Sequence, residues 1–180
     1  SGPGGCSALD GHGLGSYTSD YGYWKLEHDG GSSVNPNDRV VVRLYDLNVG
    51  AYPFKGFIFK TSAGTLTVKD SANTQAVSAC DGAIGHLDAE NKKDVDVYLD
   101  LPSTTGTVTV TAEIVESKTY VYKLTLDIEV TDARATGGTI TTFGDYIIHN
   151  FTSSGIFTVT DSSLTEVEVL VVGGGGGGGG

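Results

Sequence analysis

The sequence predicts an all-β protein whose main part is an antiparallel β-sandwich. Short runs rich in β-branched and aromatic residues recur along the first 130 residues, and Gly, Pro, Asn and Asp turn signals separate them. No stretch sustains the 3.6-residue period of an amphipathic helix. Seven or eight short strands separated in this way are typical of a sandwich.

The predicted strands of this first part follow one another between turns. A short strand is expected at residues 21–26, with Trp24 as a core or edge anchor. The next, at 39–45, alternates well enough for a half-buried strand. Six further strands are predicted at residues 54–59, 64–68, 76–80, 95–99, 107–112 and 120–128.

A second, smaller part is predicted after the sandwich. Residues 131–138 resemble a linker, and residues 139–180 form a small β-module with strands at 139–143, 146–151, 156–160 and 166–172. About 42 residues with one small apolar face lie near the lower limit for a domain without disulfide or metal. This module therefore needs a partner surface, either the sandwich or another subunit.

The chain ends in an apolar run followed by eight glycines. β-Branched residues predict a strand, whereas polyglycine loses the most backbone entropy on ordering. An ordered tract would pair its backbone with a sheet edge or with other polyglycine helices; the alternative is a flexible linker. The candidate assembly residues are Val167, Val169, Leu170, Val171, Val172, Gly173, Gly174, Gly175, Gly176, Gly177, Gly178, Gly179 and Gly180.

This C-terminal part resembles the glycine-rich module of phage tail adhesins and related bacterial surface proteins. The resemblance covers about a quarter of the chain and ends in the Val-Leu-Val-Val-Gly run. In that family the glycine tract is usually longer and interrupted, so pure glycine is a departure, and receptor binding is not carried over. The matching segments are residues 138–141, 145–149, 151–155 and 157–159.

Composition and charge limit the classes of molecule that this chain is expected to bind. The 22 acidic residues outnumber the 11 Lys and Arg, for a formal net charge of −11, so nucleic acid and anionic membranes are poor partners. No window of about 18 apolar residues predicts a transmembrane helix. The start at Ser1, without Met or a signal segment, is what a mature exported chain would show.

The two cysteines allow one bridge. An even count in an exported chain favours pairing of Cys6 with Cys80, while two buried thiols are the alternative. A bridge closing a loop of this length would stabilise the fold by about 4 kcal/mol in the chain-entropy model.

The first 130 residues also resemble the reeler domain, found at the N-terminus of reelin and of spondin-type matrix proteins and in some secreted defence proteins. The resemblance implies an immunoglobulin-like sandwich in an extracellular protein, supports pairing of the two cysteines, and brings no catalytic residues. The family's further cysteines are missing, and Tyr98 stands where tryptophan is common. The matching positions are Cys6, Gly11 to Gly13, Pro53 to Phe57, Cys80, Ile84, His86, Lys93, Leu101, Pro102 and Gly106 to Val108.

The sequence gives little sign of catalytic or metal chemistry, so we expect neither enzyme activity nor a cofactor. The four histidines lack the spacings of zinc or haem sites. Acidic residues cluster at 88–90 and 94–96 near Asp81; a solvated face is favoured there over a calcium site. Asn150, in Asn-Phe-Thr, is the one acceptor sequence for N-glycosylation and would have to face outward.

Two functions remain open. The favoured one is a non-enzymatic secreted subunit that self-assembles, head to tail or with another extracellular protein, through its C-terminal module. The alternative is an adhesin that recognises a glycan or a surface protein. Its contact platform would consist of exposed aromatic residues, although core and edge packing is the more common role of such residues. The candidates for the platform are Tyr17, Tyr21, Tyr23 and Trp24.

Overall fold

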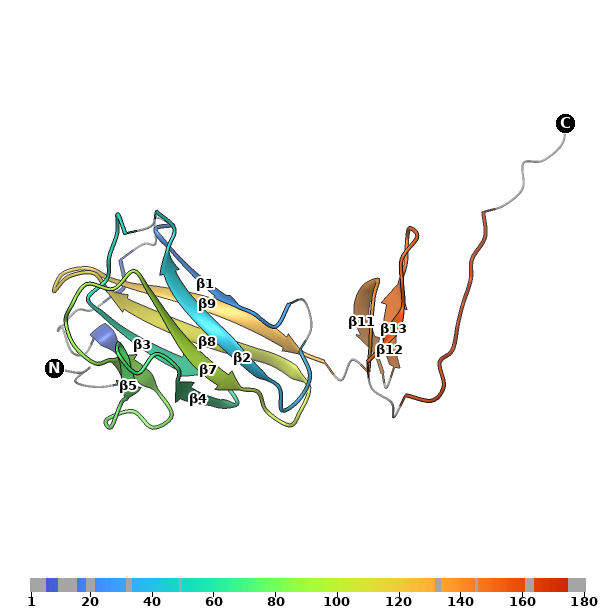
Figure 1. Cartoon of the computed structure of the whole chain (residues 1–180), viewed down its shortest axis with the longest axis horizontal. Helices are drawn as coiled ribbons and strands as arrows, with labels where there is room; N and C mark the ends of the chain where they lie inside the picture. The colour runs from blue at the N-terminus through green and yellow to red at the C-terminus, as the bar shows by residue number, and fades with distance from the viewer. Residues whose placement is uncertain are drawn as a thin grey trace, which may run out of the picture. The chain divides into compact units, whose positions relative to one another are not determined.

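The structure, a computed structural model, describes residues 6–9, 16–18, 22–31, 34–48, 50–131, 134–144, 146–160 and 164–174. The chain divides into two compact units, Ser1–Asp132 and Ala133–Gly180 (Figure 1). Each unit is described by itself. In the described part of the chain, no helix has the length and apolar character needed to cross a membrane.

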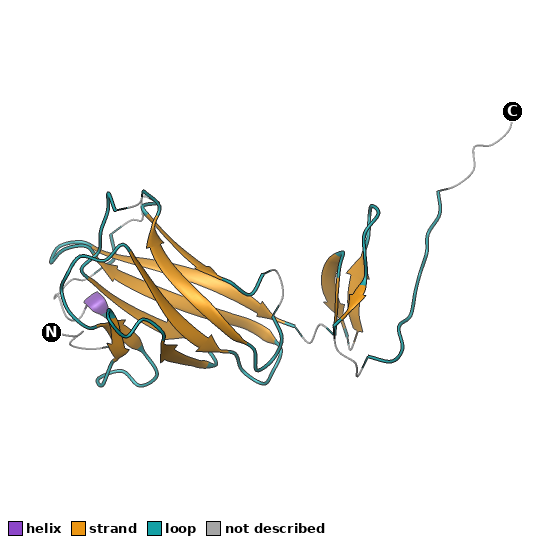
Figure 2. Ribbon diagram, in the orientation of Figure 1, coloured by secondary structure: helices purple, strands orange, loops and turns teal. Residues whose placement is uncertain are grey.

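The first unit is a sandwich of two antiparallel sheets (Figure 2), which confirms the predicted fold class. One sheet has the strand order β1-β2-β7-β4, and the other has the order β5-β6-β3-β8-β9. The four-stranded sheet contains β1 (Trp24–His28), β2 (Arg39–Asp46), β4 (Thr65–Val68) and β7 (Asp94–Asp100). The five-stranded sheet contains β3 (Gly56–Thr61), β5 (Thr74–Ala76), β6 (Ile84–His86), β8 (Gly106–Val115) and β9 (Val121–Val130).

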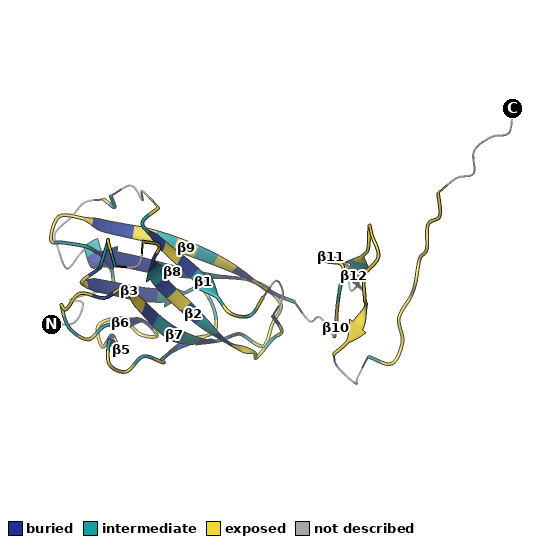
Figure 3. Cartoon of the chain, turned by 45° about the horizontal axis from the view of Figure 1, so that its top comes forward, coloured by how far each residue is buried: buried dark blue, intermediate teal, exposed yellow. Residues whose placement is uncertain are grey.

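The core lies between the inner faces of these sheets (Figure 3). Successive side chains of a strand point to opposite faces, so every second residue of β2 and β7 is buried. Aromatic rings fill the middle, where Phe57 contacts both Phe54 and Phe59 edge to face. Burial of these apolar side chains is the main stabilising contribution, at roughly 25 cal/mol per Å² removed from water.

The five-stranded sheet is also covered on its outer face. Ile58 points away from the Phe57 and Phe59 rings because it alternates with them on β3, and it is nonetheless fully buried. Its neighbours form a second apolar cluster that includes Ala8 of the N-terminal segment, Val77 and Val121. The short segment 6–9 therefore covers the part of this outer face around Ile58.

Several strand boundaries differ from the prediction. The strand predicted at residues 76–80 is wrong: β5 ends at Ala76, and the following residues form turns closed by backbone hydrogen bonds from Cys80 to Val77 and from Ala83 to Cys80. β6 was not predicted because its three residues, Ile-Gly-His, are too few to show a period.

The second unit consists of two small antiparallel ladders. β11 (Thr139–Phe143) pairs with β12 (Tyr146–Asn150), and β10 (Ala135–Thr136) pairs with β13 (Thr158–Val159). The segment predicted as a linker thus contains a strand, in which Ala135 is buried. The strand predicted at 166–172 is wrong, because residues 164–174 have no regular secondary structure.

Candidate assembly surface

The C-terminal run is apolar, exposed and unpaired. Residues 164–174 contain no strand, and Val169, Leu170, Val171 and Val172 are 79 to 88 % exposed (Figure 3). Val167 is about half exposed. A β-branched run forms a strand only when a sheet edge supplies hydrogen-bond partners, and the described part of this chain supplies none to it. These residues therefore remain available for pairing.

The glycine tract follows this run directly. Gly173 and Gly174 are exposed, and a Cβ added at either would meet open space. The remaining candidate assembly residues, Gly175 to Gly180, lie outside the described residues. The described assembly candidates are thus the apolar run and its first two glycines.

A second exposed apolar surface lies on the β11–β12 hairpin. Phe143 is opposite Tyr146 and Thr141 is opposite Ile148, so these side chains share one face of the ladder. Phe143 is 77 % exposed, and Tyr146 and Ile148 are also exposed. A two-stranded ladder is marginal without a packed face. We call Phe143, Tyr146 and Ile148 the hairpin face.

The other face of the hairpin packs within its own unit. The His149 ring contacts Phe157 edge to face at 5.0 Å, and its Nδ1 lies 2.8 Å from the carbonyl oxygen of Gly137. Gly137 and Gly138 both have positive φ, and a Cβ at Gly137 would lie 2.0 Å from the carbonyl oxygen of Ile156. Only glycine permits this close approach. Because these contacts lie on one side of the ladder, the hairpin face on the opposite side stays uncovered.

Asn150, the candidate glycosylation residue, is the last residue of β12 and is exposed. It alternates with His149 and therefore lies on the same side of the ladder as Tyr146 and Ile148. Thr152, the hydroxyl residue of the acceptor sequence, is exposed as well. The side chain thus meets the outward-facing condition that modification requires.

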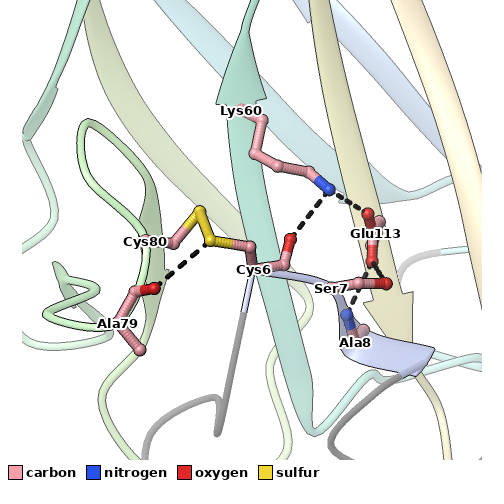
Figure 4. Close-up of a disulfide and its surroundings, with 7 residues drawn as sticks. All are labelled: Cys6, Ser7, Ala8, Lys60, Ala79, Cys80 and Glu113. Atoms are coloured by element: carbon pink, nitrogen blue, oxygen red, sulfur yellow. Dashed lines mark hydrogen bonds and ion pairs between the residues drawn. A yellow bond between two sulfur atoms is a disulfide. The ribbon is translucent and has the colours of Figure 1, made fainter.

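Cys6 and Cys80 are joined by a disulfide that attaches the N-terminal segment to the sandwich (Figure 4). Their Cα atoms are 4.8 Å apart, within the usual range for such a bond. Beside it, the backbone N–H of Ala8 donates to Oε2 of Glu113 at 2.6 Å, and the Ser7 hydroxyl donates to the same oxygen at 3.0 Å. The disulfide and these hydrogen bonds together fix segment 6–9 against the outer face.

Glu113 is the most deeply buried charged group of this cluster, with 1 % exposure. Its other carboxylate oxygen, Oε1, accepts a hydrogen bond from the ammonium of Lys60, which also donates to the carbonyl oxygen of Cys6 at 3.0 Å. Burial alone would raise the pKa of Glu113. The hydrogen bonds from Lys60, Ala8 and Ser7 outweigh that effect and hold its pKa below the ordinary value.

Neither Lys60 nor Glu113 stands out in the sequence as a site residue. The available signal was weak: a glutamate at position 113 lies between Ala112 and Ile114, in a strand whose inner positions are apolar. Such a position predicts a side chain on the opposite face. It does not predict that a distant N-terminal segment buries that side chain.

Two candidates for the aromatic platform, Trp24 and Tyr23, are used for packing, and Trp24 is the core anchor that the sequence predicts. Trp24 is only 2 % exposed, packs against the Tyr122 ring, and donates from its indole N–H to the carbonyl oxygen of Tyr52. Tyr23 stacks on Tyr52 with ring centroids 3.9 Å apart. Tyr17 is half-buried, and Tyr21 lies outside the described residues. The side chains of Trp24, Tyr23 and Tyr17 therefore pack in or against the apolar clusters of the sandwich.

Three carboxylates of the acidic clusters, those of Asp88, Asp94 and Asp96, form ion pairs with Lys or Arg. On the outer face of the four-stranded sheet, Arg43 contacts Asp94 at 2.5 Å, and Lys69 contacts Asp96 at 2.9 Å. In the loop before β7, the buried ammonium of Lys92 donates to Asp88 at 2.7 Å. Among the described residues, no three His, Cys, Asp or Glu side chains form a group arranged to hold a metal ion.

His86 has the structural role expected of it. Its ring contacts the Phe57 ring edge to face, and its Nδ1 lies 3.2 Å from both the backbone nitrogen and the carbonyl oxygen of Phe57. Gly56 makes this possible, because a Cβ there would lie 3.1 Å from the imidazole. Within the Pro53–Phe57 segment that resembles the reeler domain, Phe54 and Phe57 therefore belong to the core.

Comparison with solved structures identifies the fold of the first unit. The Reelin-N domain of F-spondin superimposes with a TM-score of 0.60 at 22% identity, over 69% of this chain and 98% of that one. Two structures of the human F-spondin reeler domain give TM-scores of 0.58 and 0.54, also at 22% identity. They cover 65% and 64% of this chain, and 94% and 95% of their own.

The sandwich has a reeler-like fold. This agrees with the resemblance of its first 130 residues to the reeler domain. No model of a known protein family matches the chain, and no curated protein matches it.

Proposed function

We propose that this chain is a non-enzymatic, secreted structural subunit that self-assembles into an extracellular filament or matrix through its C-terminal module. In this proposal the reeler-like unit is one domain, and residues 139–180 are a second domain that joins neighbouring copies. Copies bind head to tail, and a contact of this kind that does not close into a ring gives a filament.

One observation carries the proposal: Val169 to Val172 are at least 79 % exposed and have no strand partner in the described chain. Exposed apolar runs rimmed by polar residues mark interaction sites in soluble proteins. Here the hairpin face adds three more exposed apolar side chains in the same small unit. The resemblance to the glycine-rich module of tail adhesins and bacterial surface proteins also supports a role at a contact between proteins.

Secretion is supported by two features. The Cys6–Cys80 disulfide suits an oxidising compartment. The reeler-like fold is shared with F-spondin, and the resemblance to the reeler domain implies an extracellular protein of adhesion, matrix or defence type. A net charge of −11 would keep such subunits soluble before they assemble.

The alternative function, an adhesin for a glycan or a surface protein, has less support. Its aromatic platform is mostly used for packing, because Trp24 is buried and Tyr23 is stacked on Tyr52. A glycan-binding screen of the full chain distinguishes the two functions, since an adhesin binds ligand whether or not it assembles.

Light scattering and negative-stain imaging of the full chain test self-assembly. The variant Val169→Lys with Val171→Lys places two charges in the exposed run and is expected to remain monomeric under conditions in which the wild type forms large particles. The variant Thr125→Lys on β9, also at an exposed position, serves as the control for added charge. If wild type and the double variant have the same size, the proposed function is wrong.

A further inference from the structure

We propose that residues 167–172 of one copy add as a strand to the free edge of β12 in a second copy, beside the hairpin face. This inference rests on the proposed function and names the surface that receives the C-terminal run. It describes β-strand addition, in which main-chain hydrogen bonds provide affinity and alternate side chains provide specificity.

The donor has the pattern that strand addition requires. Side chains of a strand alternate, so Val167, Val169 and Val171 form one row, and Glu168, Leu170 and Val172 form the other. The first row is entirely β-branched and apolar. Placed beside β12, it continues the apolar row that Tyr146 and Ile148 already form. At six residues, the donor is long enough to pair with the five residues of β12.

The acceptor lacks the features by which proteins protect their sheet edges. Free edges are usually blunted by charged side chains, proline, short length or bulges. β11 and β12 read Thr-Ile-Thr-Thr-Phe and Tyr-Ile-Ile-His-Asn, with no Asp, Glu, Lys, Arg or Pro. A third strand would also stabilise a ladder that two strands hold only marginally.

In contrast to the hairpin, the described edge strands of the sandwich carry features that protect them from strand addition. β9 carries exposed Lys123, Asp127 and Glu129 along its length, and residues of the chain's own N-terminal part hydrogen-bond near its two ends, at Val121 and Thr131. β1 carries Lys25 and Glu27, which form an ion pair at 2.8 Å. The edge strands β4 and β5 contain only four and three residues. Strand addition is therefore favoured at the hairpin.

A second copy is the occupant because the single chain leaves both surfaces open. In the described structure the hairpin face is exposed and residues 164–174 do not pair with β12, although both belong to the same compact unit. Exchange of an element between identical chains places the same contacts between copies. Each copy then offers one donor run and one acceptor edge, so a further copy can bind at either end of the assembly.

A mixing experiment with full-length chains tests this inference. The acceptor variant is Ile148→Lys, which places a charge on the hairpin face, and the donor variant is Val169→Lys with Val171→Lys. Each variant alone is expected to be monomeric. Because one still has a donor and the other an acceptor, their equimolar mixture is expected to give a complex of twice the single-chain mass by light scattering. Thr125→Lys is again the control and should assemble as the wild type does.

The outcomes separate the two proposals. If Ile148→Lys assembles like the wild type while the donor variant does not, the run assembles elsewhere, and the hairpin is not its acceptor. If both variants and their mixture are monomeric, strand exchange between copies is excluded. The mixture still contains an intact C-terminal run and an intact hairpin, so this conclusion holds even if Ile148→Lys disrupts its own C-terminal unit. If the wild type does not assemble, both this inference and the proposed function are wrong.

Discussion

The ammonium of Lys60 on β3 contacts the buried carboxylate of Glu113 on β8, diagonally across neighbouring strands. In the ladder Lys60 is opposite Thr111, and Glu113 is opposite Ile58, so both charged side chains emerge on the outer face of the sheet. Glu113 is buried there only because segment 6–9 covers it. The ion pair and the N-terminal segment therefore depend on each other.

Replacing Lys60 with methionine should destabilise the sandwich. The change leaves Glu113 buried without its cationic partner, and removing one member of a buried pair typically costs about 3 kcal/mol or more. The measurement is the free energy of unfolding in urea. The matched change Lys118→Met, at an exposed position in the turn between β8 and β9, should have an effect within about 0.5 kcal/mol. Equal losses in the two variants would contradict the assigned role of Lys60.

Stability should fall as the solution is acidified through the low pKa of Glu113. Its pKa in the folded chain lies below the ordinary 4.5, so between these values the unfolded chain binds the proton more readily. The stabilisation is therefore complete above about pH 4.5 and is lost as the pH falls through the folded value.

Thermal unfolding of the wild type and of Glu113→Gln between pH 7 and pH 3 checks this dependence. Exposed carboxylates with lowered pKa, such as Asp88 and Asp100, are common to both chains and contribute little. The difference in Tm between the chains should narrow as the pH falls below 4.5. A difference that is constant across the range would mean that Glu113 has the same pKa in the folded and unfolded chains, which would contradict the lowered pKa.

Removing the disulfide should weaken the fold and loosen segment 6–9. Cys6 and Cys80 are 74 residues apart, and a loop of this size contributes about 4 kcal/mol in the chain-entropy model. Cys6→Ser with Cys80→Ser avoids a free thiol. Hydrogen exchange of the Ala8 amide should rise more than that of amides in β2. Unchanged protection of Ala8 would show that the hydrogen bonds to Glu113 hold the segment without the disulfide.

A glycan at Asn150 should interfere with assembly. The chain is expected to carry one when it is expressed through a eukaryotic secretory pathway, because Asn150 and Thr152 are exposed. Asn150 shares its side of β12 with Tyr146 and Ile148, so the glycan would cover the proposed acceptor. Mass spectrometry before and after enzymatic removal of N-glycans reports occupancy, and Asn150→Gln provides the unmodified control. Assembly of the fully glycosylated chain to wild-type size would contradict this placement.

Period-2 patterns in the sequence predicted most strands of the sandwich. The strand expected at 39–45 is found as Arg39–Asp46, and the one expected at 139–143 is found as Thr139–Phe143. Arg39–Asp46 alternates in burial as its sequence pattern predicts. Thr139–Phe143, in the second unit, is mostly β-branched and forms a strand although most of its residues are exposed. The strand prediction for residues 76–80 was wrong. Val77 and Ala79 alternate as they would in a strand, but hydrogen bonds within the turn determine the backbone conformation there.

The candidate site was less accessible to sequence reasoning. The run at 166–172 has the composition of a strand, but strand formation needs an edge, and composition does not show whether one is present. Likewise, the burial of Glu113 depends on a segment more than a hundred residues away in the chain. Such long-range contacts leave no periodic signal in a single sequence.

The position of the proposed joint decides which part of a subunit would carry tension. The acceptor β12 and the donor residues 167–172 both belong to the C-terminal unit, so force would pass from copy to copy between residues 146 and 172. The reeler-like sandwich and its Cys6–Cys80 disulfide lie outside that stretch of chain. Pulling on an assembly would therefore load the small C-terminal ladders and leave the sandwich folded.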